Sequence, residues 1–234
     1  MRRILIPLQL LCAIASCGGN RRAEASVVQE PQPEAVVVGA VSLPDTVFVS
    51  QPVPPEVERR IRGVSLPDGA VITLEQLRYL RLSYCDFDGN TQTGELICNA
   101  KIADDLVAIF RELYRAGYPI RSIRLIDDFG GSDDASMEAD NTSCFNYRPV
   151  AGGGHLSNHA FGLAIDVNPL ENPYIKGSKI LPPTGEPFVD RSKDFPHKID
   201  KEDLCYKLFL AHGFEWGGDW HSLKDYQHFK KKLQ

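Results

Sequence analysis

Residues that could carry out metal chemistry are concentrated in two short segments of this sequence, residues 157–166 and 216–229. A catalytic zinc ion needs three protein ligands drawn from histidine and carboxylate side chains, and it keeps a fourth position for water. His159, Asp166 and His228 provide such a set. We therefore predict that these three side chains hold one zinc ion.

Asp225 lies three residues before His228, so its carboxylate can stand beside the metal without being a ligand. From there it can take a proton from water and pass it to a leaving amine, which predicts a general base. Taken singly, each of these residues also has an ordinary structural explanation, such as a hydrogen-bonded histidine. Four further histidines are predicted to be structural, with the first and last as alternative ligands because they adjoin the motifs: His155, His197, His212 and His221.

A short strand is predicted to carry the first segment, from Gly162 to Val167. Side chains alternate along a strand, so Gly162, Ala164 and Asp166 would share one face. The two small residues would leave room for a ligand or substrate where Asp166 points. His159 would reach in from the preceding loop, and one more strand is predicted around His228.

The remaining elements predict an α+β fold. Alternating apolar residues at 80–84 and a second run at 96–98 predict a hairpin, and apolar positions at helical spacing over 102–113 predict a helix. A strand at residues 122–125, a long irregular loop at 168–196 bordering the substrate, and a helix at 201–212 follow. Because strands and helices do not alternate regularly, we expect a mostly antiparallel sheet flanked by helices.

Two motifs combine the candidate site residues. The first is Ser157-x-His159-x-x-Gly162-x-Ala164-x-Asp166. The second is Trp216-Gly217-Gly218-x-Trp220, followed by Asp225-x-x-His228-Phe229. Together they resemble the zinc D-alanyl-D-alanine carboxypeptidase family, which includes VanY-type carboxypeptidases, VanX-type dipeptidases and phage L-alanyl-D-glutamate endolysins. The resemblance covers roughly residues 80–229.

This resemblance implies a small zinc-peptidase fold of the DD-peptidase and Hedgehog-like type. It also implies that His159, Asp166 and His228 are the zinc ligands and that Asp225 is the general base. VanX- and VanY-type members usually have glutamate at the position of Asp225, whereas aspartate with Trp-Gly-Gly-x-Trp is similar to the endolysin branch. This difference favours an endopeptidase acting on peptide stems over a D-Ala-D-Ala dipeptidase.

Three further residues are assigned to the substrate. Arg148 matches the arginine that precedes the first zinc motif in the family, and a guanidinium can hold a carboxylate or stabilise an oxyanion. The alternative for Arg148 is a surface salt bridge. Ser157 either contacts the substrate or orients the loop of His159, and Trp220 is our candidate for an aromatic substrate contact.

The predicted function is zinc-dependent hydrolysis of peptide bonds in peptidoglycan stem peptides, as a D-Ala-D-Ala carboxypeptidase or an L-Ala-D-Glu type endopeptidase. One alternative is a non-catalytic module that binds peptidoglycan or a partner on the same fold. Another is a metalloenzyme for a different amide. The presence of Asp225 argues against the binding module, because a binder has no use for the base.

The N-terminal residues predict that the protein is exported from the cytoplasm. In residues 1–16, Arg2 and Arg3 precede an apolar stretch that is too short to cross a membrane. Ile14-Ala15-Ser16-Cys17 resembles the bacterial lipobox, which predicts a lipidated Cys17 that anchors the chain in a membrane. A plain secretory signal is the alternative.

Proline-rich residues 17–62 predict a linker, and residues 63–234 predict the peptidase domain. The expected location is the bacterial cell envelope. The outer membrane, facing the periplasm or the cell surface, is favoured because Gly18 replaces the aspartate associated with inner-membrane retention.

Four cysteines lie in the predicted domain: Cys85, Cys98, Cys144 and Cys205. An even number in an oxidising compartment permits two disulfides, and Cys85 with Cys98 could bridge the hairpin. Small buried thiols are the alternative. Spacing of two to four residues, typical of structural zinc sites, is absent among them.

The composition excludes several classes of protein. The chain has 234 residues, of which 43% are hydrophobic and 24% charged, values that exclude a wholly disordered chain or a multi-span membrane protein. Its 26 basic and 31 acidic residues give a formal net charge of −5, so nucleic acid is not an expected partner. Function must come from a specific site.

Overall fold

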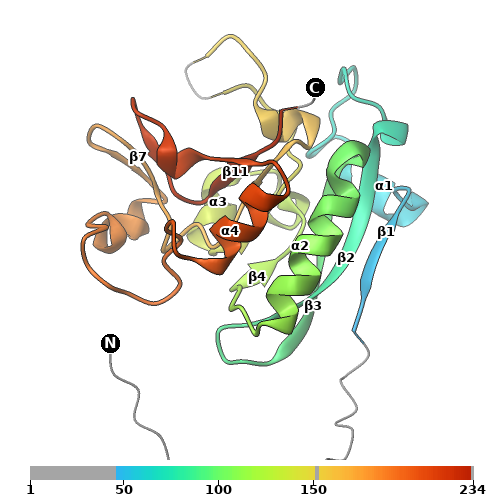
Figure 1. Cartoon of the computed structure of the whole chain (residues 1–234). Coiled ribbons are helices and arrows are strands. Elements are labelled where there is room, and N and C mark those ends of the chain that lie inside the picture. Colours follow the sequence, from blue (N-terminus) through green and yellow to red (C-terminus); the bar gives the residue numbers. More distant parts are fainter. Residues whose placement is uncertain (1–45, 151–152, 233–234) are drawn as a thin grey trace, which may run out of the picture. The chain divides into compact units, whose positions relative to one another are not determined.

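A computed structural model describes residues 46–150 and 153–232 (Figure 1). The predicted signal peptide at residues 1–16, Cys17 and most of the predicted linker lie outside these residues. Within residues 46–150 and 153–232, no helix is long and apolar enough to cross a membrane. The fold is α+β, which confirms the predicted class, and the paired strands are antiparallel except for one two-residue pair.

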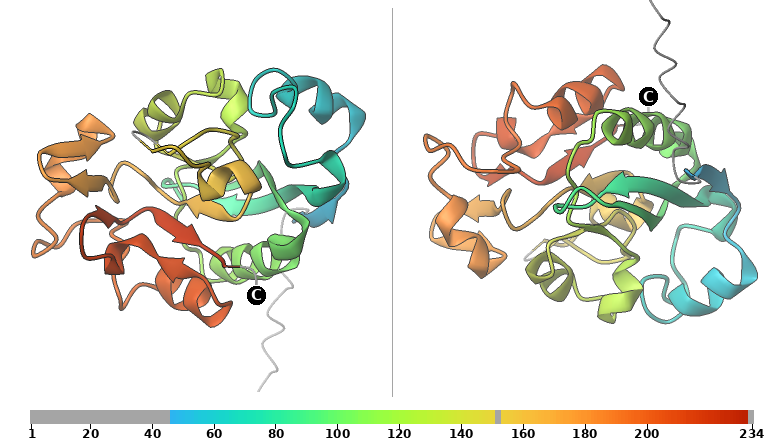
Figure 2. Two further views of the ribbon diagram at one scale, coloured as in Figure 1. Left: turned by 90° about the horizontal axis from the view of Figure 1, so that it is seen from above. Right: turned by 90° about the horizontal axis from the view of Figure 1, so that it is seen from below.

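The largest sheet is built on the predicted hairpin. Strand β2 (Leu77–Cys85) pairs antiparallel with β3 (Thr91–Asn99), and β1 (Phe48–Gln51) pairs with the other edge of β2. Helix α2 (Ala103–Arg115) buries its predicted apolar face against this sheet. Figure 2 shows α2 on one side of the hairpin and helix α3 (Asp133–Glu138) on the other.

The hairpin has apolar side chains on both faces, so the core has two parts. Leu80 and Leu82 pack with α2 on one face, and Leu77 and Tyr79 pack on the other with helix α1 (Pro55–Ile61). Because the side-chain period of a strand is two, one hairpin can hold both layers.

A second sheet has the order β6-β11-β9 and carries the candidate ligands. Its strands are β6 (Ala164–Asp166), β11 (His228–Lys230) and β9 (Glu215–Trp216). The same core cluster that contains α2 also contains Phe209 of helix α4 (Leu204–Ala211), whose ring stacks on Phe229 of β11 with centroids 4.3 Å apart. The side chain of Asp203 caps the start of α4. The helix predicted at residues 201–212 is thus present with shorter bounds.

The prediction of a long irregular loop at residues 168–196 is wrong. This segment contains strands β7 (Tyr174–Lys176) and β8 (Lys179–Leu181), then a 3-10 helix, η5 (Pro183–Phe188). Strand β7 also pairs with β10 (Lys224–Asp225), which carries the predicted base. Strands of two or three residues contain too few residues to show a period in sequence.

Two other predicted strands are shorter than expected. The pattern at residues 122–125 gives only β4 (Ser122–Ile123), which pairs in parallel with β5 (Asn141–Thr142), and a 3-10 helix begins at Ile126. Gly162 lies outside β6: it ends the 3-10 helix η4 (Asn158–Phe161) at a φ of 63°. A Cβ on Gly162 would lie 2.6 Å from the backbone nitrogen of Asn99, so the absent side chain makes room for strand β3 and not for a ligand.

Folded residues begin before the predicted domain start at residue 63. Strand β1 and helix α1 lie in the predicted linker, and Val57 and Ile61 are buried in the core. Arg60 makes two 3.0 Å hydrogen bonds to the carboxylate of Glu95 and another of 3.1 Å to Asp128. Helix α1 is therefore part of the domain.

The cysteines of the described residues are free thiols. In the hairpin, Cys85 is opposite Thr91 and Cys98 is opposite Arg78, so these two cysteines lie at opposite ends. Seven residues of strand separate the two ends by roughly 23 Å, far beyond the reach of a disulfide. Cys98, Cys144 and Cys205 are buried, in line with the alternative prediction of buried thiols.

A chain of residues 63–234 should have a lower free energy of unfolding than a chain of residues 46–234. The deletion removes the burial of Val57 and Ile61, worth about 1.5–3 kcal/mol each, and the β1 ladder. We expect the midpoint of thermal unfolding to fall by about 10 °C or more. Equal midpoints for the two chains in a calorimetric scan would show that α1 is dispensable.

A buried pair of carboxyl groups should make stability depend on pH. Asp140 and Glu171 are 4% and 8% exposed and lie within hydrogen-bond reach of each other. Burial and the neighbouring Asp140 raise the pKa of Glu171 to about 8. Because the folded chain holds this proton more tightly than the unfolded chain, the free energy of unfolding should decrease as pH rises from about 4.5 to 8, by at most about 1.4 kcal/mol per pH unit.

The variant Glu171→Gln tests this origin, since a neutral amide has no proton to lose. Its midpoint of thermal unfolding should change less between pH 5 and pH 8 than that of the unmodified chain. Glu186→Gln, at an exposed position of the same segment, is the control. Its midpoint should change with pH as much as that of the unmodified chain. A Glu171→Gln variant with the original pH profile would place the dependence elsewhere.

Candidate metal centre

His159, Asp166 and His228 converge in the structure. One ligand atom from each lies within 4.8 Å of the others. His159 Nε2 is 3.2 Å from His228 Nδ1 and 3.3 Å from Asp166 Oδ2, and His228 Nδ1 is 2.9 Å from Asp166 Oδ1. Ligand atoms around one tetrahedral zinc ion at 2.0–2.1 Å are roughly 3.3 Å apart, so the spacing of this group suits one ion.

The register of two strands brings two of these residues together. His228 of β11 lies directly opposite Asp166 of β6. The next pair, Phe229 and Ile165, points to the other face and is fully buried in the core. A slip of one residue would send His228 into the core, so the packing of Phe229 enforces the pairing of the ligands.

His159 comes from the short helix η4, and its orientation is set by its neighbours. The side chain of Ser157 accepts a 3.2 Å hydrogen bond from the His159 backbone nitrogen. Ser157 is itself buried, and its backbone nitrogen donates to the Arg148 carbonyl. The Ser157 hydroxyl therefore caps the start of the helix that carries His159, and its predicted contact with the substrate stays a prediction.

The imidazole of His159 is fixed by a backbone carbonyl. Its Nδ1 lies 2.6 Å from the oxygen of Cys144, which can only accept, so Nδ1 carries the proton. This leaves Nε2 with a lone pair directed at Asp166 and His228. A hydrogen bond from the other ring nitrogen is the usual way in which a metal-binding histidine is oriented.

The charges at the cluster favour a cation. The two imidazoles hold the pKa of Asp166 far below its usual range despite burial, so this carboxylate is ionised. Burial opposes protonation of His159, but the Asp166 carboxylate raises its pKa overall. Burial lowers the pKa of His228. The group therefore combines one buried negative charge with imidazole nitrogens, a donor set typical of catalytic zinc.

Asp225 lies beside this cluster and is not one of its three members. Its Oδ1 is buried and has no hydrogen-bond partner among the described residues. Burial, and then the negative charge of Asp166, raise the pKa of Asp225 well above its usual value, while the charges of His159 and Arg148 oppose this. These influences place the Asp225 carboxyl group in the electrostatic field of the cluster.

Two glycines of the second motif allow this placement. A Cβ on Gly217 would lie 2.5 Å from the Asp225 carbonyl oxygen, and a Cβ on Gly218 would lie 2.3 Å from the ring of Trp216. Trp216 in turn donates a 2.8 Å hydrogen bond from its indole nitrogen to the Tyr226 carbonyl. The Trp-Gly-Gly motif is thus a close-packed support for the chain that carries Asp225.

Arg148 is an ion-pair partner of Asp133 at the start of α3. Asn146 donates a 2.8 Å hydrogen bond to Asp133, and the Asn146 backbone nitrogen bonds to the His159 carbonyl. Arg148 is about one-third exposed, so the predicted alternative of a salt bridge is partly correct. Its charge nevertheless acts on both His159 and Asp225.

Sequence reasoning did not identify Asp133 or Asn146. Asp133 is one of several acidic residues in a Gly/Asp/Ser segment, and nothing in its spacing connects it to Arg148. For Asn146, the one indication in the sequence is that it lies two residues before the candidate Arg148. The contact arises because the start of α3 packs beside the segment that carries Asn146 and Arg148.

Trp220 is half-buried next to the cluster. Its ring centroid lies 5.3 Å from that of His228. Neither alternative ligand, His155 or His221, belongs to the cluster. His212 Nδ1 lies 3.0 Å from Asp105 Oδ1, and the His197 ring stacks on Phe87 with centroids 3.7 Å apart. Both histidines therefore have the structural roles predicted for them.

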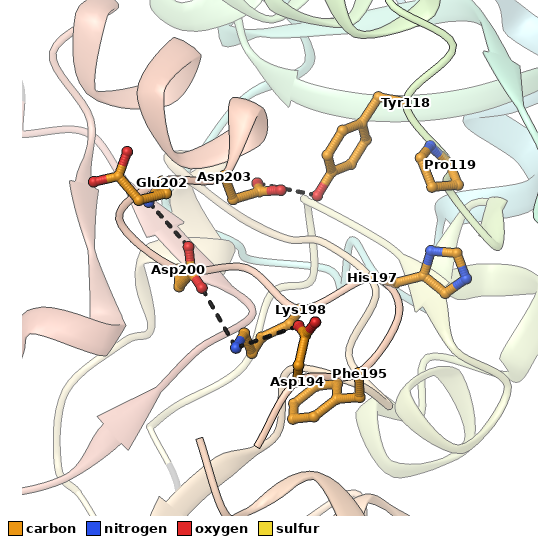
Figure 3. Close-up of a pocket in the computed structure, with 9 residues that line it drawn as sticks. All are labelled: Tyr118, Pro119, Asp194, Phe195, His197, Lys198, Asp200, Glu202 and Asp203. Atoms are coloured by element: carbon orange, nitrogen blue, oxygen red, sulfur yellow. Dashed lines mark hydrogen bonds and ion pairs between the residues drawn. The ribbon is translucent and has the colours of Figure 1, made fainter. Parts of the chain in front are cut away.

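A separate cavity of about 340 Å³ lies between the α2–β4 connection and the segment before α4 (Figure 3). Its lining includes Tyr118, His197 and Lys198 together with four carboxylates. Asp203 accepts a hydrogen bond from Tyr118, and Lys198 pairs with Asp194 and Asp200, so most of the charged groups of this cavity already have partners. None of the predicted site residues lines this cavity.

Comparison with known proteins gives one match. A family model described as D-alanyl-D-alanine carboxypeptidase matches residues 151–231. No curated protein and no solved structure matches the chain. The matched residues include all three members of the cluster and Asp225, and Arg148 lies three residues before them.

Substituting Gly217 should disturb the support of Asp225. In Gly217→Ala the new methyl group must displace the Asp225 backbone, and we expect a loss of about 1–3 kcal/mol in the free energy of unfolding. Gly154→Ala is the control, because a Cβ there meets nothing within 4 Å, and its change should stay below about 1 kcal/mol. Equal unfolding curves for both variants in denaturant would contradict the close packing.

Proposed function

We propose that the chain is a zinc-dependent peptidase acting on peptidoglycan stem peptides, because the segment that carries the cluster matches the family model described as D-alanyl-D-alanine carboxypeptidase. The observation that carries this proposal is the convergence of His159, Asp166 and His228 with Asp225 beside them. Carboxypeptidase cleavage at D-Ala-D-Ala and endopeptidase cleavage at L-Ala-D-Glu are the two forms of this activity. Aspartate at position 225 favours the endopeptidase.

The residues present fit one zinc ion. His159 Nε2, His228 Nδ1 and a carboxylate oxygen of Asp166 would hold it, because these atoms face one another and the His159 tautomer is already set by Cys144. A zinc ion bound by two histidines and one carboxylate supplies a Lewis acid for the scissile carbonyl and lowers the pKa of water in its open position.

Asp225 is proposed to move the proton in this reaction. Its buried Oδ1 has no partner in the described part of the chain and is free to accept a proton from the attacking water. A carboxyl group whose pKa is raised by burial is a stronger base than an exposed aspartate. The same group can then give this proton to the departing amine.

Arg148 is proposed to stabilise negative charge on the substrate. Asp133 engages its Nε, and the remaining guanidinium nitrogens are available to an oxyanion or a carboxylate. Because Asp133 is itself held by Asn146, the guanidinium is oriented before the substrate binds. Such preorganised donors are a major source of transition-state stabilisation.

The cellular setting is part of the same proposal. A lipid on Cys17 would anchor the chain in the bacterial envelope, where stem peptides are present. The described domain begins near residue 46, so the segment from Cys17 to residue 45 would connect anchor and domain. The non-catalytic binding module and the peptidase differ in their need for Asp225, which makes this residue the point to test.

Replacing Asp225 should separate catalysis from metal binding. In Asp225→Asn we expect zinc content to stay at one equivalent while hydrolysis of purified stem peptides falls by about 10²-fold to 10⁴-fold. Removing zinc with a chelator should abolish hydrolysis in the unmodified chain, and adding zinc back should restore it. Metal analysis and mass spectrometry of the products provide the two measurements and identify the bond.

Asp219→Asn is the matched control, since Asp219 belongs to the same motif but pairs with Lys201 at the surface. It should retain both zinc and activity. Zinc binding by the unmodified chain without any cleavage would favour the binding module. A chain that binds no zinc would overturn the ligand assignment.

A further inference from the structure

One face of the β6-β11-β9 sheet carries the ligands, and the opposite face is core. On the core side, Ile165, Phe229 and Trp216 are 0–5% exposed. Side chains two residues apart on a strand point to the same side, so Lys230 shares the face of His228. In an extended strand these two residues are about 7 Å apart.

Trp220 confirms that Lys230 lies on this face. The Lys230 ammonium is 4.9 Å from the centroid of the Trp220 ring, and that ring is 5.3 Å from the His228 ring. A cation over an indole is held by the negative face of the ring. One aromatic side chain therefore contacts both the candidate ligand and the lysine, and it limits where the ammonium can go.

The positive charge of Lys230 is only partly balanced. Its nearest carboxylate is Glu215, with Nζ and Oε2 3.6 Å apart. Glu215 is also bound by Lys232, whose Nζ is closer, at 3.1 Å from Oε1. Two lysines share one carboxylate, so this edge of the metal centre keeps a net positive charge.

Lys230 also has the exposure expected of a binding group. Its side chain is 21% exposed, in contrast to 75% for Lys232. A lysine with a partly buried stem and an accessible ammonium binds an anion with less competition from water than a fully exposed lysine. Arg148 provides the other cation near the cluster, and its charge acts on His159 and Asp225.

We propose that Lys230, placed by Trp220, binds a free carboxylate of the substrate peptide and makes the enzyme selective for acidic peptides. This inference rests on the proposed function and specifies the substrate class at the same site. The carboxylate would lie within about two residues of the scissile bond, given the separation of Lys230 from His228 along the strand. In a stem peptide whose third residue is lysine, two groups have this chemistry, its terminal carboxylate and the free carboxylate of its internal D-Glu residue.

The test compares three stem pentapeptides with lysine at the third position: one with both carboxylates free, one amidated at the terminus and one amidated at D-Glu. Cleavage by the zinc-loaded chain is measured for Lys230→Gln and for Lys232→Gln, the matched control that pairs with the same Glu215. We expect Lys230→Gln to raise KM about tenfold for the free peptide with little change in kcat. Lys232→Gln should leave both constants unchanged.

The amidated peptides identify the carboxylate that Lys230 binds. Amidation of that group should raise KM for the unmodified chain by the same factor and remove the effect of Lys230→Gln. Lys230→Arg should restore most of the affinity for the free peptide. If Lys230→Gln raises KM equally for all three peptides, or lowers only kcat, the proposal is overturned, because the lysine then acts through packing.

A binding measurement separates this proposal from the peptidase itself. The zinc-loaded Asp225→Asn chain, with and without Lys230→Gln, is titrated with the same three peptides by calorimetry. A dissociation constant that depends on Lys230 and on one free carboxylate supports the carboxylate site even if the unmodified chain cleaves nothing. Equal dissociation constants for the free and amidated peptides would reject it, whatever the catalytic result.

Discussion

The pairing of β6 with β11 is the constraint on which the candidate centre depends. Asp166 and His228 face each other only in this register, and the register is held by Ile165 and Phe229 on the opposite face. Burying these two apolar side chains therefore has a direct chemical effect: it places a carboxylate and an imidazole 2.9 Å apart. Two charged or polar groups brought so close are stable where a cation or proton lies between them.

His159 reaches the same point by a different route. It lies on a short 3-10 helix that Ser157 begins and Gly162 ends, and this helix packs against the end of β3. The core hairpin thus positions one ligand and the β6-β11 pair positions the other two. Because both are packed into the same apolar cluster, the distance between the ligands is set by the core.

The candidate base depends on a third sheet. β10 is held by β7, and Gly217 allows the chain before it to approach the Asp225 backbone. The resulting burial leaves Asp225 with a free oxygen near an ionised Asp166, which is an unfavourable arrangement for a structural role alone. Strained or unsatisfied groups of this kind are characteristic of functional sites.

The sequence by itself determined the α+β class, the hairpin, helix α2 and the identities of the cluster residues. Each of these has a local signature: alternation in β2, helical spacing from Ile102 to Leu113, and ligand-type residues embedded in glycine-rich motifs. The tertiary structure decided the rest. It placed Asp133 against Arg148, turned the expected loop into the strand that holds β10, and brought α1 into the core. The physical reason is that these features depend on contacts between distant segments, and a two-residue strand or a single ion pair has no period that a sequence can show.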